Sequence, residues 1–146
     1  MGRLSILSQI IQEVDAVYQC LDEQLAKMDS SCRACGDCCD FESFGHKLYV
    51  TTPELVYFQH FLNPKEMKTD VCPYRIEGKC TVYPYRFSGC RIFSCKGDTE
   101  KENALCEQAI RKFKARCNEY SIPYQYVYLR AGLDILRSDP KFKIKN

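Results

Sequence analysis

Cysteines dominate the residues of this chain that could do chemistry. The sequence holds 11 cysteines in 146 residues, and eight of them gather between positions 32 and 95. Thiols at this density serve either as a disulfide framework or as thiolates that bind a metal or carry out redox chemistry. An odd number of cysteines cannot all pair, and a chain of this length can fold without covalent cross-links. We therefore expect thiolates held for metal binding.

The first cysteine group follows the pattern CxxCxxCC. Its members are Cys32, Cys35, Cys38 and Cys39. The spacing brings several thiolates together in a short loop, and Gly36 allows the backbone to turn between them. Backbone amides exposed in such a turn can donate hydrogen bonds to sulfur. Packing alone does not require so many cysteines in so short a segment, so the group predicts metal ligands rather than buried structural thiols.

The second cysteine group is spread over two short predicted loops. Its members are Cys72, Cys80, Cys90 and Cys95. The two groups together supply eight thiols, which is twice the four sulfur ligands of a structural zinc or of a 4Fe-4S cluster. Two four-thiolate sites are compatible with this number, and so is one such site with four supporting cysteines. The spacing leaves that partition open.

The choice of metal depends on ligand softness. Thiolate sites suit both zinc and iron-sulfur clusters, and only two histidines, His46 and His60, are available to diversify the ligands. This composition slightly favours an iron-sulfur cluster, with 4Fe-4S preferred and zinc as the alternative. His46 lies near the first group, where it is a candidate ligand or proton donor, although a single histidine is more often an ordinary surface or core residue. His60 falls on a predicted helix and is a weaker candidate.

Charged and aromatic residues beside the cysteines have two interpretations each. Arg33 and Arg91 could offset the negative charge of the thiolates, or they could be solvated surface residues. Three tyrosines flank the second group, where their rings could shield a cluster from water or simply pack against the core. These are Tyr74, Tyr83 and Tyr85.

The two cysteine groups resemble the YkgJ-type cysteine-cluster family. The segments that carry the resemblance are CRACGDCC at 32–39 and CPYRIEGKCTVYPYRFSGCRIFSC at 72–95. They join CxxCxxCC to a CP, a GxCTxY and a CRxFxC in the order typical of the family, over about the middle half of the chain. The family is described as zinc- or iron-chelating, so the resemblance implies that the same eight cysteines form the cluster. Arg86-Phe87 stands where family members often have Arg-Pro, which changes a loop but removes no ligand.

The resemblance implies a chelating scaffold and leaves the biological role open. A metal centre with a structural or redox role is preferred. The alternatives are a zinc-organised interaction module with a protein partner, or an accessory component of a methylation-type protein-modification enzyme, since a related cluster accompanies flagellin lysine methylation in some bacterial proteins. The glycines are scattered and form no nucleoside-binding loop, so a methyltransferase domain is not expected here. Catalysis by the chain itself is left undecided.

The elements that must position these cysteines are mostly helical. Apolar residues recur every three to four positions from Leu4 to Met28, which predicts a long amphipathic helix. A short extended piece is expected at 47–51. The residues from Thr51 to Glu54 combine a hydroxyl cap, a proline and an acid, and they predict a helix that continues to about Phe61. Glu77-Gly78 predicts a turn between two short extended pieces.

The C-terminal third is also expected to be helical. One apolar stripe follows Gly97 and a second helix is predicted from about 121–123 to 138. The cysteines outside the two groups fall on predicted helices, where they should act as small packing residues: Cys20, Cys106 and Cys117. The expected fold is mainly α with little β, and its helices flank an irregular cysteine-rich metal-binding core. We expect one domain over 1–146, with an N-terminal helix at 1–29, the cysteine-cluster core at 30–97 and C-terminal helices at 98–146.

Composition excludes several other classes of protein. The hydrophobic content of 45% and the formal net charge of +2 argue against disorder. The only local basic excess is a short C-terminal run of lysines, so nucleic-acid binding is not expected. Neither a signal peptide nor an apolar run long enough to cross a bilayer is evident. The sequence therefore predicts a cytoplasmic protein without membrane contact, in a compartment that keeps thiols reduced.

Overall fold

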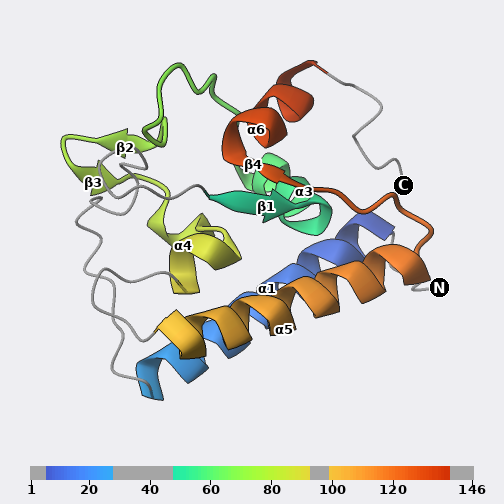
Figure 1. The fold of residues 1–146 in the computed structure, drawn as a ribbon. Coiled ribbons are helices and arrows are strands. Elements are labelled where there is room, and N and C mark those ends of the chain that lie inside the picture. The colour runs from blue at the N-terminus through green and yellow to red at the C-terminus, as the bar shows by residue number, and fades with distance from the viewer. Residues whose placement is uncertain (1–5, 28–47, 93–98, 139–146) are drawn as a thin grey trace.

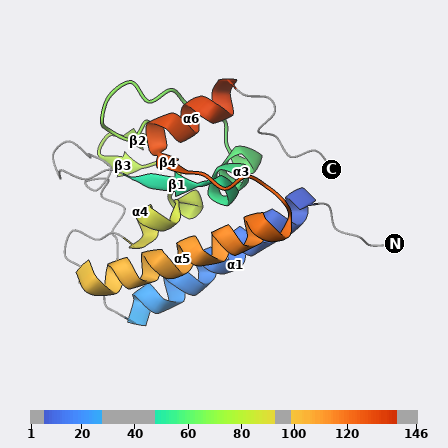
Figure 2. The ribbon, with the colours of Figure 1, turned by 45° about the vertical axis from the view of Figure 1, so that its right-hand side comes forward.

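The computed structural model describes residues 6–27, 48–92 and 99–138, and these are mainly helical (Figure 1). Helices account for 66% of the described residues and strands for 10%, so the predicted fold class is confirmed at this level. Two long helices, α1 (Ile6–Lys27) and α5 (Thr99–Glu119), lie side by side and run in opposite directions (Figures 1 and 2). The amphipathic helix predicted near the N-terminus is therefore present as α1.

The helix α3 (Thr52–Phe61) lies between two layers of the structure. Its start was predicted correctly, since Thr51 is the N-cap and its hydroxyl oxygen accepts a hydrogen bond from the backbone N–H of Glu54 at 3.4 Å. One side of α3 packs with α1 and α5 in a first core, which we call the helical core. Its buried residues are Ile10, Val14, Val17, Tyr18, Leu21, Leu25, Val56, Tyr57, Ile92, Leu105, Ala109 and Phe113.

The other side of α3 packs against a second core, which we call the cysteine-side core. It lies beneath the small sheet formed by β1 (Tyr49–Thr51) and β4 (Tyr126–Tyr128) and beneath α6 (Leu129–Ser138). Its buried residues are Leu48, Val50, Leu55, Phe58, Met67, Cys72, Tyr74, Phe87, Leu129, Leu133 and Leu136. Because α3 contributes to both cores, its residues from Thr52 to Phe58 are all buried.

The helix predicted between about residue 121 and residue 138 is present as α6, but its predicted start was wrong, because α6 begins at Leu129. The chain leaves α5 through Ser121, whose φ is +56°, and then forms the strand β4 before α6 begins at Leu129. The strand pairs antiparallel with β1, with Tyr49 opposite Tyr128. Alternating aromatic and β-branched residues favour strands when a partner strand is available, and here that partner lies far away in the sequence. Periodicity within the segment could not reveal it.

A β-hairpin and a short helix form the remaining described part of the second cysteine group. The strands β2 (Arg75–Ile76) and β3 (Lys79–Cys80) pair antiparallel. The turn between them has positive φ at both Glu77 (53°) and Gly78 (76°), the combination that a tight hairpin turn requires. The predicted Glu77-Gly78 turn is therefore confirmed. A 3-10 turn, η2 (Tyr83–Tyr85), leads to the helix α4 (Ser88–Ile92).

Candidate metal centre

The structure describes three of the eight predicted ligands. Cys32, Cys35, Cys38, Cys39 and Cys95 lie outside the described residues, as do His46 and Arg33. The three that are described, Cys72, Cys80 and Cys90, come from a turn, a strand and a short helix. None of them lies on a long helix.

Cys72 opens a tight turn at the edge of the cysteine-side core. Its carbonyl accepts a hydrogen bond from the N–H of Arg75 at 3.0 Å, and Pro73 occupies the position of such a turn that favours proline. Cys72 is only 8% exposed. It belongs to the same buried cluster as Tyr74. Burial raises the pKa of Tyr74, and a negative charge at Cys72 would add to that rise. The turn therefore fixes the backbone of Cys72 at a partly apolar position.

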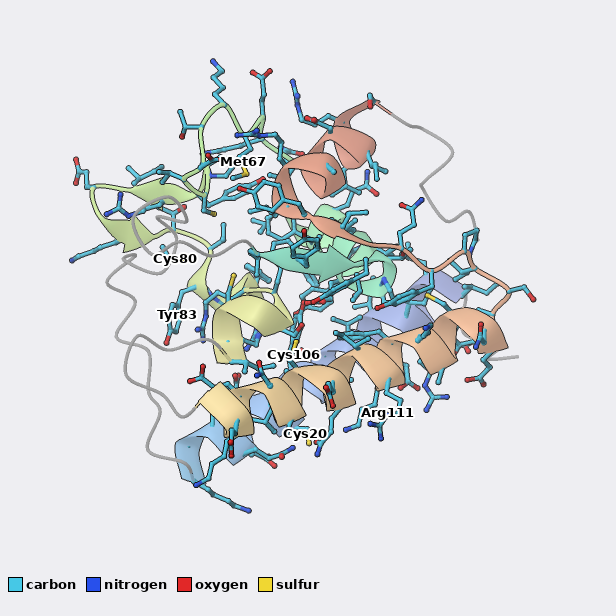
Figure 3. All side chains as sticks on the ribbon, in the orientation of Figure 1. Cys20, Met67, Cys80, Tyr83, Cys106 and Arg111 are labelled. Atoms are coloured by element: carbon cyan, nitrogen blue, oxygen red, sulfur yellow. The ribbon has the colours of Figure 1, made fainter. Side chains whose placement is uncertain are left out.

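Cys80 ends the second strand of the hairpin and is half-buried. It lies opposite Arg75 in the antiparallel register. The next residue, Thr81, donates from both its N–H (2.9 Å) and its hydroxyl (2.6 Å) to the carbonyl of Tyr74. These bonds tie the two ends of the hairpin together and so keep Cys80 close in the fold to the turn that carries Cys72. Figure 3 shows Cys80 at the hairpin, away from Cys20 and Cys106 on the long helices.

Cys90 lies on α4, and buried Arg91 holds that helix in place. The Arg91 guanidinium donates to Asp22 of α1 at 2.7 Å and to the carbonyls of Arg86 and Pro84 at 2.9 and 2.8 Å. It also lies 4.1 Å from the centre of the Tyr18 ring. The arginine side chain is only 6% exposed, so the interpretation of Arg91 as a solvated surface residue was wrong. It joins the segment before Cys90 to α1.

A buried carboxylate anchors the N-terminus of the same short helix. Glu54 on α3 is 1% exposed. Its carboxylate accepts hydrogen bonds from the N–H (2.6 Å) and hydroxyl (3.0 Å) of Ser88 on α4. It also accepts from the hydroxyls of Tyr18 (2.9 Å) and Thr51 (3.0 Å). Burial raises the pKa of Glu54, and these four donors oppose that rise. One carboxylate thus links α1, α3 and α4.

Sequence reasoning missed the role of Glu54. A glutamate in the first turn of a helix interacts favourably with the positive end of the helix dipole, and this interaction does not require burial. Only the tertiary contacts reveal that the carboxylate is buried and shared between three helices. Arg91 was noticed for its place beside Cys90, but its partner Asp22 lies on another helix and has no signal in the local sequence.

The predicted tyrosine shield has a more specific description in the structure. Tyr74 is 4% exposed and packs edge-to-face on Phe58, with 5.2 Å between ring centres. Its hydroxyl donates to the carbonyl of Asn63 at 2.8 Å and accepts from the N–H of Lys65 at 2.9 Å. Tyr85 stacks on Phe61, and the guanidinium of Arg86 covers the ring of Tyr83. These contacts support the packing interpretation, and shielding of a cluster stays a prediction.

The described cysteines and carboxylates do not form a metal site by themselves. Among residues 6–27, 48–92 and 99–138, no three His, Cys, Asp or Glu side chains are grouped as metal ligands would be. Cys72, Cys80 and Cys90 supply soft thiol donors, which fit zinc or an iron-sulfur cluster chemically. A complete thiolate site would need cysteines from outside these ranges.

The remaining cysteines belong to the long helices. Cys117 on α5 is 2% exposed, and burial raises the pKa of its thiol to about 11, as expected of a packing residue. Cys20 on α1 is half-buried, and its sulfur lies 3.1 Å from the side-chain amide of Gln24. Cys106 differs, because it borders a cavity that Tyr126 also lines. The position of a cysteine on a helix therefore did not predict whether its side chain packs in the core or borders a cavity.

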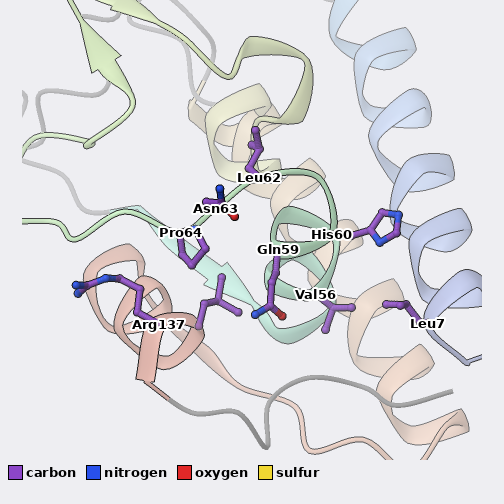
Figure 4. A pocket seen from close by; sticks show the side chains of 9 residues that line it. Leu7, Val56, Gln59, His60, Leu62, Asn63, Pro64 and Arg137 are labelled. Atoms are coloured by element: carbon purple, nitrogen blue, oxygen red, sulfur yellow. The ribbon is translucent and has the colours of Figure 1, made fainter.

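His60 lies near the end of α3, where it lines an open groove of about 660 Å³ (Figure 4). The described lining of this groove also includes Leu7, Gln59, Asn63 and Arg137, and it contains no cysteine or carboxylate. A single histidine without a second donor of this kind does not make a metal site. The groove therefore gives no support for His60 as a ligand.

Comparison with family models, with curated proteins and with solved structures finds no match for this chain. The resemblance to the YkgJ-type family therefore stays a prediction based on the cysteine spacing. In the described part of the chain, no helix combines the length and the apolar composition needed to cross a membrane.

Proposed function

We propose that the chain is a metal-binding protein whose centre is built from thiolates of both cysteine groups. The observation that carries the proposal is the spacing of the eight cysteines between 32 and 95, since this density of thiols exceeds what packing needs. An iron-sulfur cluster of the 4Fe-4S type with a structural or redox role is preferred, and zinc is the alternative. The proposed location is the cytoplasm, where thiols stay reduced.

The contrast between the two kinds of cysteine supports this proposal. Cys72, Cys80 and Cys90 lie on short elements fixed by backbone and side-chain hydrogen bonds, whereas the other described cysteines lie on long helices. A hairpin with such short strands is marginally stable alone, so an added cross-link at its base would contribute to its stability. Metal binding by thiolates would supply that cross-link.

Metal analysis of anaerobically purified protein tests the proposal. We expect iron with inorganic sulfide, or else zinc, at a near-integral ratio to protein. An iron-sulfur cluster gives a brown protein with visible absorption, whereas a zinc protein is colourless. Protein that carries neither metal and has fully reduced thiols would contradict the proposal.

Matched cysteine variants locate the ligands. Cys35→Ser, Cys38→Ser and Cys80→Ser should abolish or change metal binding, because each removes a thiolate from the proposed centre. Cys20→Ala and Cys117→Ala should keep the metal-to-protein ratio of the wild type. Equal loss of metal in both sets would show that the division of the cysteines is wrong.

Hydrogen exchange tests where the metal acts. Because thiolate binding is coupled to folding, chelation should loosen the region of the cysteine groups first. Amides of β2 and β3 should exchange faster after metal removal, while those in the middle of α1 and α5 should change little. Unchanged protection in the hairpin after complete removal of metal would count against the proposal.

Two other roles share the same centre. In the first, zinc organises loops that bind a protein partner. In the second, the chain supports a methylation-type modification enzyme. A colourless zinc form that binds a protein only when metal is present would favour the first alternative over a redox role.

A further inference from the structure

A cavity of about 210 Å³ lies between the small sheet, α4 and α5. The residues that line it include Tyr49 and Tyr126 of the sheet and Glu102 and Cys106 of α5. Gly89 of α4 also lines it. No lysine, arginine or histidine occurs among the described residues that line it. The cavity is separate from the groove beside His60.

Two stacked tyrosines belong to the lining of the cavity. The ring centres of Tyr49 and Tyr126 are 5.3 Å apart and the ring planes differ by 29°. The two residues are 42% and 44% exposed, among the most exposed large hydrophobic residues in the described structure. The antiparallel pairing of β1 and β4 holds both on one face of the sheet. The rings are therefore held in place on the surface, where they are available to a ligand.

The Tyr126 hydroxyl and the Cys106 thiol are neutral near pH 7. Tyr126 lies close to Cys106, and burial followed by the effect of Cys106 raises the pKa of Tyr126 to about 12. Burial also raises the pKa of the Cys106 thiol. A protonated thiol is a weak nucleophile, so this arrangement suits binding better than covalent chemistry.

Glu102 is the acidic residue among those that line the cavity. The residue is 8% exposed and lies in the first turn of α5. The positive end of the helix favours the ionised carboxylate at this position. Stabilisation of the helix alone would explain an acid in the first turn. It does not explain a buried acid that lines a cavity together with two exposed aromatic residues.

We propose that this cavity binds a small organic ammonium ion, held by the Glu102 carboxylate and the rings of Tyr49 and Tyr126. Aromatic faces attract cations, and a neighbouring carboxylate adds charge complementarity. The cavity is smaller than the roughly 300–1,000 Å³ of pockets for drug-sized molecules, so an alkylammonium group suits its size. The proposal does not depend on the metal centre, although α4 borders both regions.

Titrations followed by two-dimensional NMR of ¹⁵N-labelled, metal-loaded protein test the proposal. The probes are tetramethylammonium and n-butylammonium chloride, with neopentanol as the neutral comparison and sodium chloride as the salt control. We expect saturable shifts of the Gly89, Asn103 and Cys106 amides, with tetramethylammonium bound at least about fivefold more tightly than neopentanol. The Gln59 and Asn63 amides in the other groove should not shift. Equal affinity for the neutral probe, or equal shifts in both grooves, would overturn the proposal.

Two carboxylate variants on α5 form a matched pair. Glu102→Gln should weaken tetramethylammonium binding about tenfold, because it removes the charge and keeps the shape. Glu107→Gln removes an exposed charge from the same helix and should change the affinity less than about twofold. If Glu102→Gln does not fold, Tyr126→Leu serves instead and should weaken binding several-fold. Wild-type affinity in a folded Glu102→Gln or Tyr126→Leu variant would overturn the proposal.

The same variants separate this proposal from the metal proposal. Glu102→Gln should keep the metal-to-protein ratio of the wild type, so loss of cation binding and loss of metal are independent outcomes. Nα-acetyl-lysine methylamide distinguishes two sources of the ligand. If this compound binds as tightly as n-butylammonium, the natural ligand is a lysine side chain of a partner protein. If it binds clearly more weakly, the natural ligand is a free amine.

Discussion

The helical core and the cysteine-side core are built in different ways, although α3 contributes to both. In the helical core, long helices bury continuous apolar stripes, and most of the buried residues lie on α1 and α5. In the cysteine-side core, short strands, turns and α6 meet, and Cys72 is part of the apolar packing. Long helices supply many contacts for each ordered residue, whereas short elements depend on neighbours. The proposed metal centre therefore lies in the part of the molecule whose short elements depend most on their neighbours for stability.

Glu54 and Arg91 connect the two halves. Glu54 accepts hydrogen bonds from Tyr18 of α1 and from Ser88 of α4, while Arg91 of α4 reaches Asp22 of α1. Both residues are buried, and the bonds of Glu54 are formed away from water, where an unsatisfied group would be costly, whereas Asp22 is half exposed. The helix that carries Cys90 is therefore held by polar contacts to the helical half.

The sharpest test of the comparison is the same truncation in each core. Phe113 of the helical core and Phe58 of the cysteine-side core are 1% and 0% exposed. Replacing either with alanine should lower the free energy of unfolding by about 3–5 kcal/mol, through lost burial and a cavity. Phe58 also contacts Phe87 and Tyr74, with ring centres 4.8 and 5.2 Å apart, so only Phe58→Ala should weaken metal retention.

Urea denaturation measures the first effect, and metal content during competition with a chelator measures the second. Phe113→Ala is the control for a general loss of stability. If both variants lose metal equally at matched stability, the two cores are not separate in function.

Removing the carboxylate that joins the halves should have the next largest effect. Glu54→Ala leaves the N–H and hydroxyl of Ser88 and the hydroxyl of Tyr18 without their acceptor in a buried site. We expect a loss of about 2–4 kcal/mol in the free energy of unfolding. Substitution of the exposed Glu107 on α5 by alanine is the control and should change stability little.

The pH dependence of stability sharpens this prediction. Because burial raises the pKa of Glu54 above 4.5, the folded state binds its proton more tightly than the unfolded state does. The contribution of Glu54 to stability is therefore fully present below about pH 4.5 and falls as the pH rises through the folded-state pKa. Glu54→Gln removes this titration, so the stability of the wild type relative to Glu54→Gln should decrease from about pH 4 to pH 8. Parallel stability curves for the two proteins would contradict the raised pKa.

A smaller effect is expected from the packing cysteine of α5. Cys117→Ala removes a small buried side chain and should lower the free energy of unfolding by about 1 kcal/mol. In the native protein, burial and a thiol pKa of about 11 should make Cys117 react with iodoacetamide more slowly than Cys20 does. Mass spectrometry of timed samples measures both rates. Faster labelling of Cys117 would contradict its assignment to the core.

The smallest expected effect tests how closely α6 approaches the sheet. A Cβ atom at Gly132 would lie 3.0 Å from side-chain carbons of both Leu55 and Val50, which are themselves fully buried. Alanine favours helices by about 1 kcal/mol over glycine, but overpacking costs about 1–3 kcal/mol. Gly132→Ala should therefore destabilise the protein by about 1 kcal/mol in thermal or urea unfolding. A more stable variant would show that this contact relaxes easily.

Local sequence signals determined the long helices, the cap of α3 and the hairpin turn. The apolar stripe of α1, the Thr51 cap and the Glu77-Gly78 turn each depend on residues close in sequence, so their physical cause is contained in the segment itself. The chemical class of the proposed site was also available from the sequence, because thiol number and spacing need no coordinates. The ligand partition stays a prediction, since most of the proposed ligands lie outside the described residues.

Tertiary structure decided the features whose partners are distant in sequence. Tyr126 to Tyr128 form a strand because β1 offers free edge positions, although the segment was predicted to be helical. Glu54 is buried because Tyr18, Thr51 and Ser88 surround it with donors, and Cys106 meets Tyr126 only when β4 packs beside α5. A periodic pattern reports which face of an element is apolar. It cannot report which element will cover that face, and this choice determines where a charge, a thiol or a cavity lies.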